Sequence, residues 1–225
     1  MFIELVDSLR CVRPHELTWL VASATRMDAR DIVVGELGCH VCGAEYPIVD
    51  GIADFTLGQE PQSSPSTDAD ATDADATKAE SPALLGEEMA MRAAALLDLA
   101  EPGGFVALTG AWGGCAPRLA ELAPRVHLLL LDPPVGTESG DGISLARVHD
   151  DIPIRPAMCR GVALDAAHAT PRIVTAAVDA LRPRGRLVAP ASLATPAGIT
   201  ELARDERHWV GEKEAPAPIV RIRRK

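Results

Sequence analysis

The stretch Phe105-Val-Ala-Leu-Thr-Gly-Ala-Trp-Gly-Gly114 decides the fold of the larger part of this chain. It begins as a short apolar strand and ends in a glycine-containing turn, which a helix candidate over 117–122 follows. The largely apolar run Val126–Leu131 comes next, as expected for a strand buried on both faces of a parallel sheet. Because strand-like and helical stretches go on alternating, residues 83–225 predict an α/β domain with a parallel sheet.

The same alternation extends on both sides of this stretch. It predicts two more helices and three more strands: helices over 83–99 and 172–181, and strands over 143–148, 161–164 and 185–189. In the tail, we expect a closing hairpin from 209–210 and 219–222.

Composition limits the class of protein. Hydrophobic residues make up 47% of the 225 residues, which is enough for a core and excludes a wholly disordered chain. The net charge of −10 (22 basic against 32 acidic residues) argues against a protein that coats nucleic acid. The sequence has no apolar run of about 18 residues, no recognisable secretory signal and too few cysteines for a disulfide framework. We therefore expect a soluble, cytoplasmic protein without a membrane span.

Residues 58–82 separate a small N-terminal part from the α/β part. They contain no large apolar residue, and between Glu60 and Glu80 six acidic residues stand against one lysine. Such a segment cannot bury enough surface to offset its ordering entropy. We predict an acidic disordered linker over 58–82, between a domain over 1–57 and one over 83–225.

The N-terminal part contains a candidate metal site. Cys39-His-Val-Cys42-Gly is a knuckle in which two thiolates can chelate one metal and the glycine permits a tight turn. Cys11 and His15, in the spacing C-x3-H, complete a tetrahedral Cys3His set for zinc. The alternative is a pair of ordinary buried thiols in a domain that has lost its zinc, with His15 an exposed residue at a helix start.

A resemblance supports the zinc interpretation. Cys39-His-Val-Cys-Gly-Ala-Glu-Tyr-Pro-Ile-Val-Asp-Gly-Ile-Ala53 resembles the second knuckle of the small zinc-ribbon family that includes activator subunits of tRNA, rRNA and release-factor methyltransferases. Tyr46 and Ile48 alternate as in a strand, and Asp50-Gly51 is typical of a hairpin turn. The first half departs from the family, because its Cys-Pro-x-Cys is replaced here by Cys11-Val-Arg-Pro-His15.

The part from residue 84 onward resembles class I S-adenosylmethionine-dependent methyltransferases. Four landmarks carry the resemblance: the glycine loop after Phe105, Asp132 after the second strand, Asp150-Asp-Ile-Pro-Ile154, and Leu181-Arg-Pro-Arg-Gly-Arg-Leu-Val188. The resemblance implies a Rossmann-like class I methyltransferase sheet joined to the N-terminal zinc-ribbon-like small β domain. It also implies S-adenosylmethionine as the cofactor, with four residues in contact with it: Gly110, Gly114, Asp132 and Asp151.

The glycine loop departs from the family pattern acid-x-Gly-x-Gly-x-Gly. Leu108 stands in place of the acid that pairs with the cofactor's ammonium group, and Trp112 stands in place of the middle glycine. An indole there is expected to point its bulk at or near the methionine portion of the cofactor. A shifted loop that uses Gly110, Gly113 and Gly114 is an alternative that would rescue binding.

After the fourth predicted strand, Asp165 and His168 lie where such enzymes often hold groups that orient the substrate. They are either an acid–base pair or a helix N-cap and a surface histidine.

Two functions follow from these patterns. One is a catalytically degenerate methyltransferase-like protein that acts as a binding or structural subunit with a protein partner. The other is an active methyltransferase with its zinc-ribbon activator fused in cis.

Overall fold

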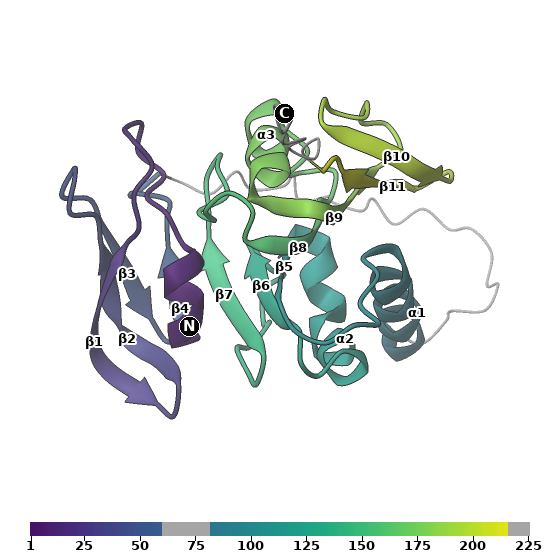
Figure 1. The fold of residues 1–225 in the computed structure, drawn as a ribbon. Helices are drawn as coiled ribbons and strands as arrows, with labels where there is room; N and C mark the ends of the chain where they lie inside the picture. The colour runs from purple at the N-terminus through teal and green to yellow at the C-terminus, as the bar shows by residue number, and fades with distance from the viewer. Residues whose placement is uncertain (60–81, 216–225) are drawn as a thin grey trace, which may run out of the picture.

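The computed structural model describes residues 1–59 and 82–215, with backbone only for 82–85. The described strands form one sheet of eleven strands in the order β1-β2-β3-β4-β7-β6-β5-β8-β9-β11-β10 (Figure 1). The elements in chain order are η1 (Ile3–Ser8), β1 (Val21–Asp28), β2 (Asp31–Gly38), β3 (Glu45–Val49), β4 (Ile52–Asp54), α1 (Pro82–Leu96), β5 (Phe105–Thr109), η2 (Gly110–Cys115), α2 (Ala116–Leu122), β6 (His127–Leu131), β7 (Ile143–Arg147), β8 (Cys159–Ala163), α3 (Pro171–Ala180), β9 (Leu181–Pro190), β10 (Ile199–Arg204) and β11 (His208–Lys213).

The strands from β5 onward form a Rossmann-like sheet, which confirms the predicted α/β class. Strands β7-β6-β5-β8-β9 are all parallel, and counted from β5 their order is 3-2-1-4-5, that of a doubly wound sheet. The last pair differs, because β11 runs antiparallel to both β9 and β10. A ligand site is therefore expected at the carboxyl ends of β5, β6 and β8, near the point where the strand order reverses.

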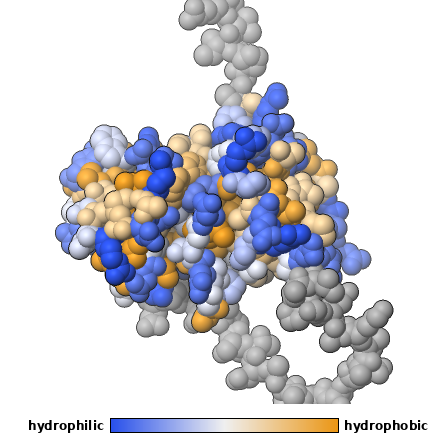
Figure 2. All heavy atoms as spheres, turned by 90° about the horizontal axis from the view of Figure 1, so that it is seen from below, coloured by the Kyte–Doolittle hydropathy of each residue, from blue (hydrophilic) through white to orange (hydrophobic). Residues whose placement is uncertain are grey.

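Burial of β6 on both faces explains why its sequence lacks a polar side. Leu128 and Leu130 pack into one core with residues of α1 and α2, whereas Leu129 and Leu131 pack into a second core with residues of α3. Neighbouring side chains of a strand point to opposite faces, so the helices cover both sides of the sheet. Outside these cores, Figure 2 shows hydrophobic and hydrophilic residues interspersed over the face seen from below.

The N-terminal part is an antiparallel β-ribbon joined edge to edge to the Rossmann-like sheet. Its turn at Asp50-Gly51 has the predicted geometry, with φ of 49° and 79°, and connects β3 directly to β4. Ile52 of β4 then pairs with Leu145 of β7 in parallel, so one hydrogen-bonded sheet continues from the ribbon into the larger part. Arg10 strengthens this connection through an ion pair with Asp151.

Some predicted elements differ from the structure. The predicted hairpin partner of 209–210 is wrong: Trp209 and Val210 lie in β11 and pair with β9 and with β10, a strand that the sequence pattern does not predict. Segment 219–222 lies outside the described residues, and so do residues 60–81 of the predicted linker. Among the described residues, no helix is long and apolar enough to cross a membrane.

Candidate functional site

A cleft of about 740 Å³ lies at the carboxyl ends of the parallel strands. Gly110 follows β5, Asp132 follows β6, and Asp165 follows β8, so the topology brings these three residues together. The ribbon also contributes, because Ile52 of β4 is part of the wall. Neither Ile52 nor Arg147 is predicted here from the sequence, since only the pairing of β4 with β7 makes them neighbours of the cleft.

His168 connects two carboxylates within this cleft. Its Nδ1 lies 2.5 Å from Oδ1 of Asp165, and its Nε2 lies 3.3 Å from Oδ2 of Asp132. Burial opposes the charged form of His168, but the hydrogen bonds and charges of Asp132 and Asp165 outweigh burial and raise its pKa to about 9. Burial also acts to raise the pKa of Asp165, yet its bonds to His168 and to the Ala111 N–H lower that pKa to about 2. At neutral pH the group is therefore an imidazolium between carboxylates.

The Asp165 carboxylate also packs against the glycine loop and accepts hydrogen bonds from it. Its Oδ2 accepts the Ala111 N–H at 3.1 Å, and its Oδ1 accepts the Thr109 hydroxyl at 3.1 Å. A Cβ built on Gly110 would lie only 2.1 Å from Oδ2 of Asp165. Gly110 also has φ of +45°, so both the backbone conformation and the neighbouring carboxylate require a residue without a side chain here.

Asp132 is engaged on both of its oxygens. Oδ1 accepts the Val148 N–H at 3.0 Å, and Oδ2 faces His168. The side chain is 19% exposed. The carboxylate thus stands in the predicted place but already has partners within the chain.

Two other predicted cofactor contacts lie elsewhere. Gly114 is in η2, where a Cβ would have nothing within 4 Å, and it does not line the cleft. Asp151 does not line the cleft either, since its Oδ1 lies 2.5 Å from Nη2 of Arg10 and accepts the Ile152 N–H. Asp151 therefore holds the ribbon against the larger part.

The prediction for Trp112 needs correction. Its indole is only 4% exposed and donates from Nε1 to the Leu164 carbonyl at 3.2 Å. The loop turns as a 3-10 helix, which directs the ring into the core shared with α1 and α2 and not into the cleft. Leu108 is fully buried in the same core. Trp112 therefore does not fill the space that was expected for the cofactor.

The predicted metal ligands come together in the ribbon. One ligand atom each of Cys11, His15, Cys39 and Cys42 lies within 4.8 Å of all the others. The two sulfurs of Cys11 and Cys42 are 3.7 Å apart, and Sγ of Cys39 is 3.4 Å from Nε2 of His15. Tetrahedral zinc with ordinary bond lengths would require about 3.8 Å and about 3.6 Å for such pairs, so the donor set fits zinc. His40 instead contacts the Thr18 hydroxyl at 3.2 Å.

The surroundings of the cluster favour the thiolate of Cys39 but the neutral thiol of Cys11. Burial disfavours the thiolate of Cys39, but the backbone N–H groups of Val41 and Cys42 outweigh it and lower its pKa to about 7. Burial raises the pKa of Cys11 to about 11 despite a 3.0 Å contact with the Tyr46 hydroxyl. Tyr46 is fully buried, so this contact holds the Cys11 sulfur in place from the core side.

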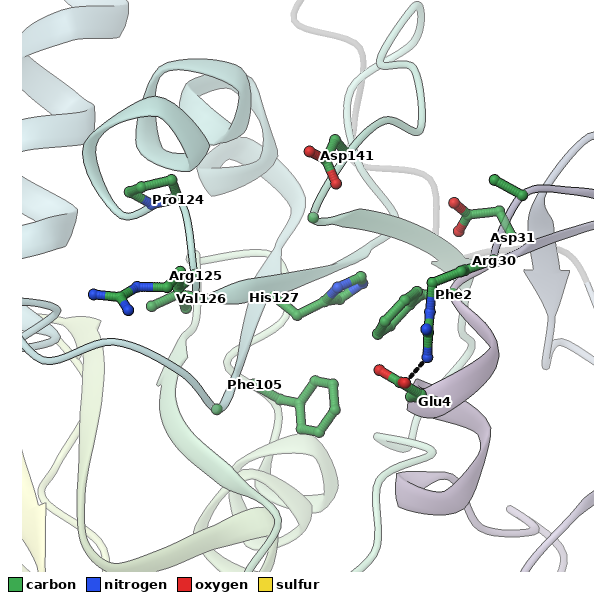
Figure 3. Close-up of a pocket in the computed structure, with 13 residues that line it drawn as sticks. Phe2, Glu4, Arg30, Asp31, Phe105, Pro124, Arg125, Val126, His127 and Asp141 are labelled. Atoms are coloured by element: carbon green, nitrogen blue, oxygen red, sulfur yellow. Dashed lines mark ion pairs between the residues drawn. The ribbon is translucent and has the colours of Figure 1, made fainter.

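A second cleft, of about 450 Å³, lies at the amino ends of the parallel strands, between the ribbon and β6 (Figure 3). Phe2 stacks on His127 with ring centroids 4.5 Å apart, and Phe105 meets the same imidazole edge-on at 5.9 Å. Nε2 of His127 lies 2.9 Å from the Ser144 hydroxyl. Burial, helped by the N-terminal ammonium group, lowers the pKa of His127 to about 4. This histidine is therefore neutral at pH 7.

Comparison with known proteins yields similarities to solved structures. No protein-family model matches the chain. No curated protein matches it either. MycE methyltransferase of the mycinamycin pathway, solved with Mg and SAH, has 15% identity and a TM-score of 0.46, over 64% of this chain and 53% of that chain. The pyocyanin biosynthetic protein PhzM has 15% identity and a TM-score of 0.41, over 56% of this chain and 54% of that chain.

A third similar structure is a complex of the Haloferax volcanii Trm112 methyltransferase activator with a methyltransferase. It has 15% identity and a TM-score of 0.43, over 60% of this chain and 96% of that chain. The chain thus spans about half the length of the first two structures. None of these likenesses, all with TM-scores below 0.5, says what this chain binds or does.

Proposed function

We propose that this chain is a methyltransferase-like protein without methyltransferase activity, which acts as a binding or structural subunit of a larger assembly. The observation that carries this proposal is the Asp165 carboxylate against Gly110 and the Ala111 N–H. A cofactor would have to approach this backbone closely, but the Asp165 carboxylate already occupies the space beside it.

Two further features act against binding of S-adenosylmethionine. Leu108, which replaces the acid of the family pattern, is fully buried and offers nothing to an ammonium group. Asp132, the counterpart of the acid that binds the ribose hydroxyls, has both oxygens engaged by Val148 and His168. A cofactor would have to displace the buried imidazolium and leave its charge without partners, which is costly.

We further propose that the ribbon, residues 1–57, is a module fused in cis whose Cys11, His15, Cys39 and Cys42 hold one structural zinc ion. Four protein ligands would leave no coordination position open for a substrate. Three apolar side chains near this cluster are exposed: Leu17 at 58%, Trp19 at 56% and Val41 at 44%. Clustered exposed apolar residues favour a protein partner at this end of the molecule.

An active methyltransferase with its activator fused in cis is the second candidate. The observation that favours it is the cleft itself, whose volume of about 740 Å³ remains open beside Gly110 and Asp132. Binding of the cofactor there would require His168 and Asp165 to move.

Calorimetric titration with S-adenosylmethionine and S-adenosylhomocysteine separates the two candidates. We expect no binding at millimolar cofactor, and micromolar binding would overturn the proposal. The double variant Asp165→Ala/His168→Ala removes the blocking groups and should bring binding of S-adenosylhomocysteine into the measurable range. Asp132→Ala alone should leave the wild-type result unchanged, since a loss of binding requires binding to exist.

Zinc is tested by metal analysis of the purified protein. We expect one zinc ion per chain in the wild type and none in Cys39→Ala/Cys42→Ala, whose ribbon should also unfold several kcal/mol more easily. Cys115→Ala is the matched control, because Cys115 is buried in the other core and should not affect metal content. A wild-type protein that folds equally well after chelation would contradict a structural zinc.

A further inference from the structure

A separate pocket of about 450 Å³ lies beside the cleft, between α1, η2 and the beginning of β11. It shares Ala111 and Asp165 with the cleft but opens onto other residues, among them Met89, Trp112 and His208. Trp112 belongs to the glycine loop, whereas Met89 and His208 belong neither to the metal cluster nor to the cofactor landmarks. The pocket therefore needs an explanation of its own.

The walls of this pocket are largely apolar and include the small part of Trp112 that is exposed, 4% of the residue. Trp112 is held by its hydrogen bond to the Leu164 carbonyl. The imidazole of His208 lies beside it, with ring centroids 5.0 Å apart and planes at 52°. Met89 of α1 and Pro190 of β9 also line the pocket, and Met89 is 37% exposed although it is apolar. This arrangement suits a flat apolar group.

Nitrogen donors gather at the β11 side of the same pocket. Asp205 already accepts the backbone N–H groups of Arg207 and His208 and forms an ion pair with Arg92. Within 1–59 and 82–215, the Arg207 guanidinium has no ion-pair partner. In those residues, Nδ1 of His208 and Nε of Arg92 are buried without a hydrogen-bond partner. Burial and the nearby Arg92 guanidinium lower the pKa of His208, and Arg92 is paired with Asp205, so the free positive charge on this side is that of the exposed Arg207.

Negative groups do not cancel this charge inside the pocket. Asp165 also lines it, but its carboxylate is paired with His168. Glu88 lines it from α1 and is exposed like Arg207, so solvent screens both of these charges. An anionic group at the β11 side would meet Arg207 without a buried competitor.

We propose that this pocket binds a small aromatic carboxylate, with its ring against Met89, Pro190 and the small exposed part of Trp112 and its carboxylate directed to Arg207. The site adjoins the cofactor cleft, with which it shares Ala111 and Asp165, and it does not require catalysis. Trp112 then lines a ligand pocket, while the glycine loop to which it belongs is covered on the cleft side by the Asp165 carboxylate.

The test uses 1-naphthoate as the probe and nitrogen-15 NMR spectra of the full chain. The three indole N–H signals, from Trp19, Trp112 and Trp209, report separately on exposed, pocket and core positions. We expect the Trp112 signal to shift saturably while the other two stay in place. Arg207→Ala should weaken binding of 1-naphthoate about tenfold and leave binding of the neutral 1-naphthamide unchanged.

Two further variants complete the test. Met89→Glu adds a negative charge to the wall at a half-exposed position and should also weaken binding of 1-naphthoate. Arg125→Ala is the matched control, because Arg125 lines the other cleft (Figure 3). No saturable shift of Trp112, equal affinity in Arg207→Ala, or a loss in Arg125→Ala instead would overturn the proposal.

Discussion

The two ends of one parallel sheet each hold a partly buried histidine, and the two histidines carry different charge at neutral pH. His168, at the carboxyl ends, lies between Asp132 and Asp165, and its pKa is raised to about 9. His127, at the amino ends, lies between Phe2 and Phe105, and its pKa is lowered to about 4. Both are similarly buried, so the partners decide the charge. The histidine at the carboxyl ends is held by ion pairs, and the histidine at the amino ends is held by aromatic packing.

The largest loss of stability is expected from Gly110→Ala, which should disrupt the ion pair of Asp165 with His168. The new Cβ would lie 2.1 Å from the Asp165 carboxylate at a positive φ, so Asp165 must leave His168. We expect the free energy of unfolding to fall by about 3 kcal/mol. Gly114→Ala is the matched control in the same loop, because nothing lies within 4 Å of its Cβ. Denaturant unfolding measures both, and equal losses would contradict the contact with Asp165.

Raising the pH tests the contribution of His168 to the stability of the fold. Its pKa is higher in the folded state than in the unfolded state, so its contribution is fully present below about pH 6.5 and is lost as the pH rises through about 9. We expect roughly 2–3 kcal/mol of stability to disappear over this range. Unfolding curves between pH 6.5 and 9.5 measure this loss. In His168→Gln, the free energy of unfolding should depend much less on pH over this range. An unchanged pH dependence in that variant would show that His168 is not the group responsible.

Lowering the pH tests the contribution of His127 to stability, and the expected change in the free energy of unfolding is somewhat smaller. Its folded pKa lies below the unfolded value, so the unfolded state binds the proton more readily and stability is lost as the pH falls from 6.5 toward 4. At pH 5 the loss should be about 2 kcal/mol. His127→Phe keeps the stacking on Phe2 and should remove this acid limb. At pH 7 the same variant should change stability by about 1 kcal/mol or less.

The sequence predicts the Rossmann-like part well because its strands are buried on both faces. β6 reads as an apolar run for this reason, and α3 begins near the predicted residue because Thr170 caps it and Pro171 fits its first turn. β1 and β10 escape prediction, since nearly all their side chains are exposed and their sequences show no apolar alternation.

The candidate sites divide in the same way. The ligand set of Cys11, His15, Cys39 and Cys42 could be named from spacing, although its closeness in space required the ribbon to fold. Gly110 and Asp132 were placed at the cleft by topology. The contact of His168 with Asp165 is one of the two alternatives that the sequence offers for this pair. Its contact with Asp132 joins residues 36 positions apart and depends on side-chain orientation, which no local pattern contains. The inward turn of Trp112 depends on the 3-10 geometry of the loop in the same way.

The parallel pairing of β4 with β7 has a consequence for solubility. Without the ribbon, β7 would present a nearly fully buried strand as an open edge with unpaired N–H and C=O groups, which is a template for aggregation. The two strands that do form the outer edges, β1 and β10, are mostly exposed and carry charged side chains, and each has an irregular register with its neighbour. Such edges resist further strand addition. By pairing with β7, the ribbon therefore protects the larger part from edge-to-edge aggregation, whatever else the ribbon binds.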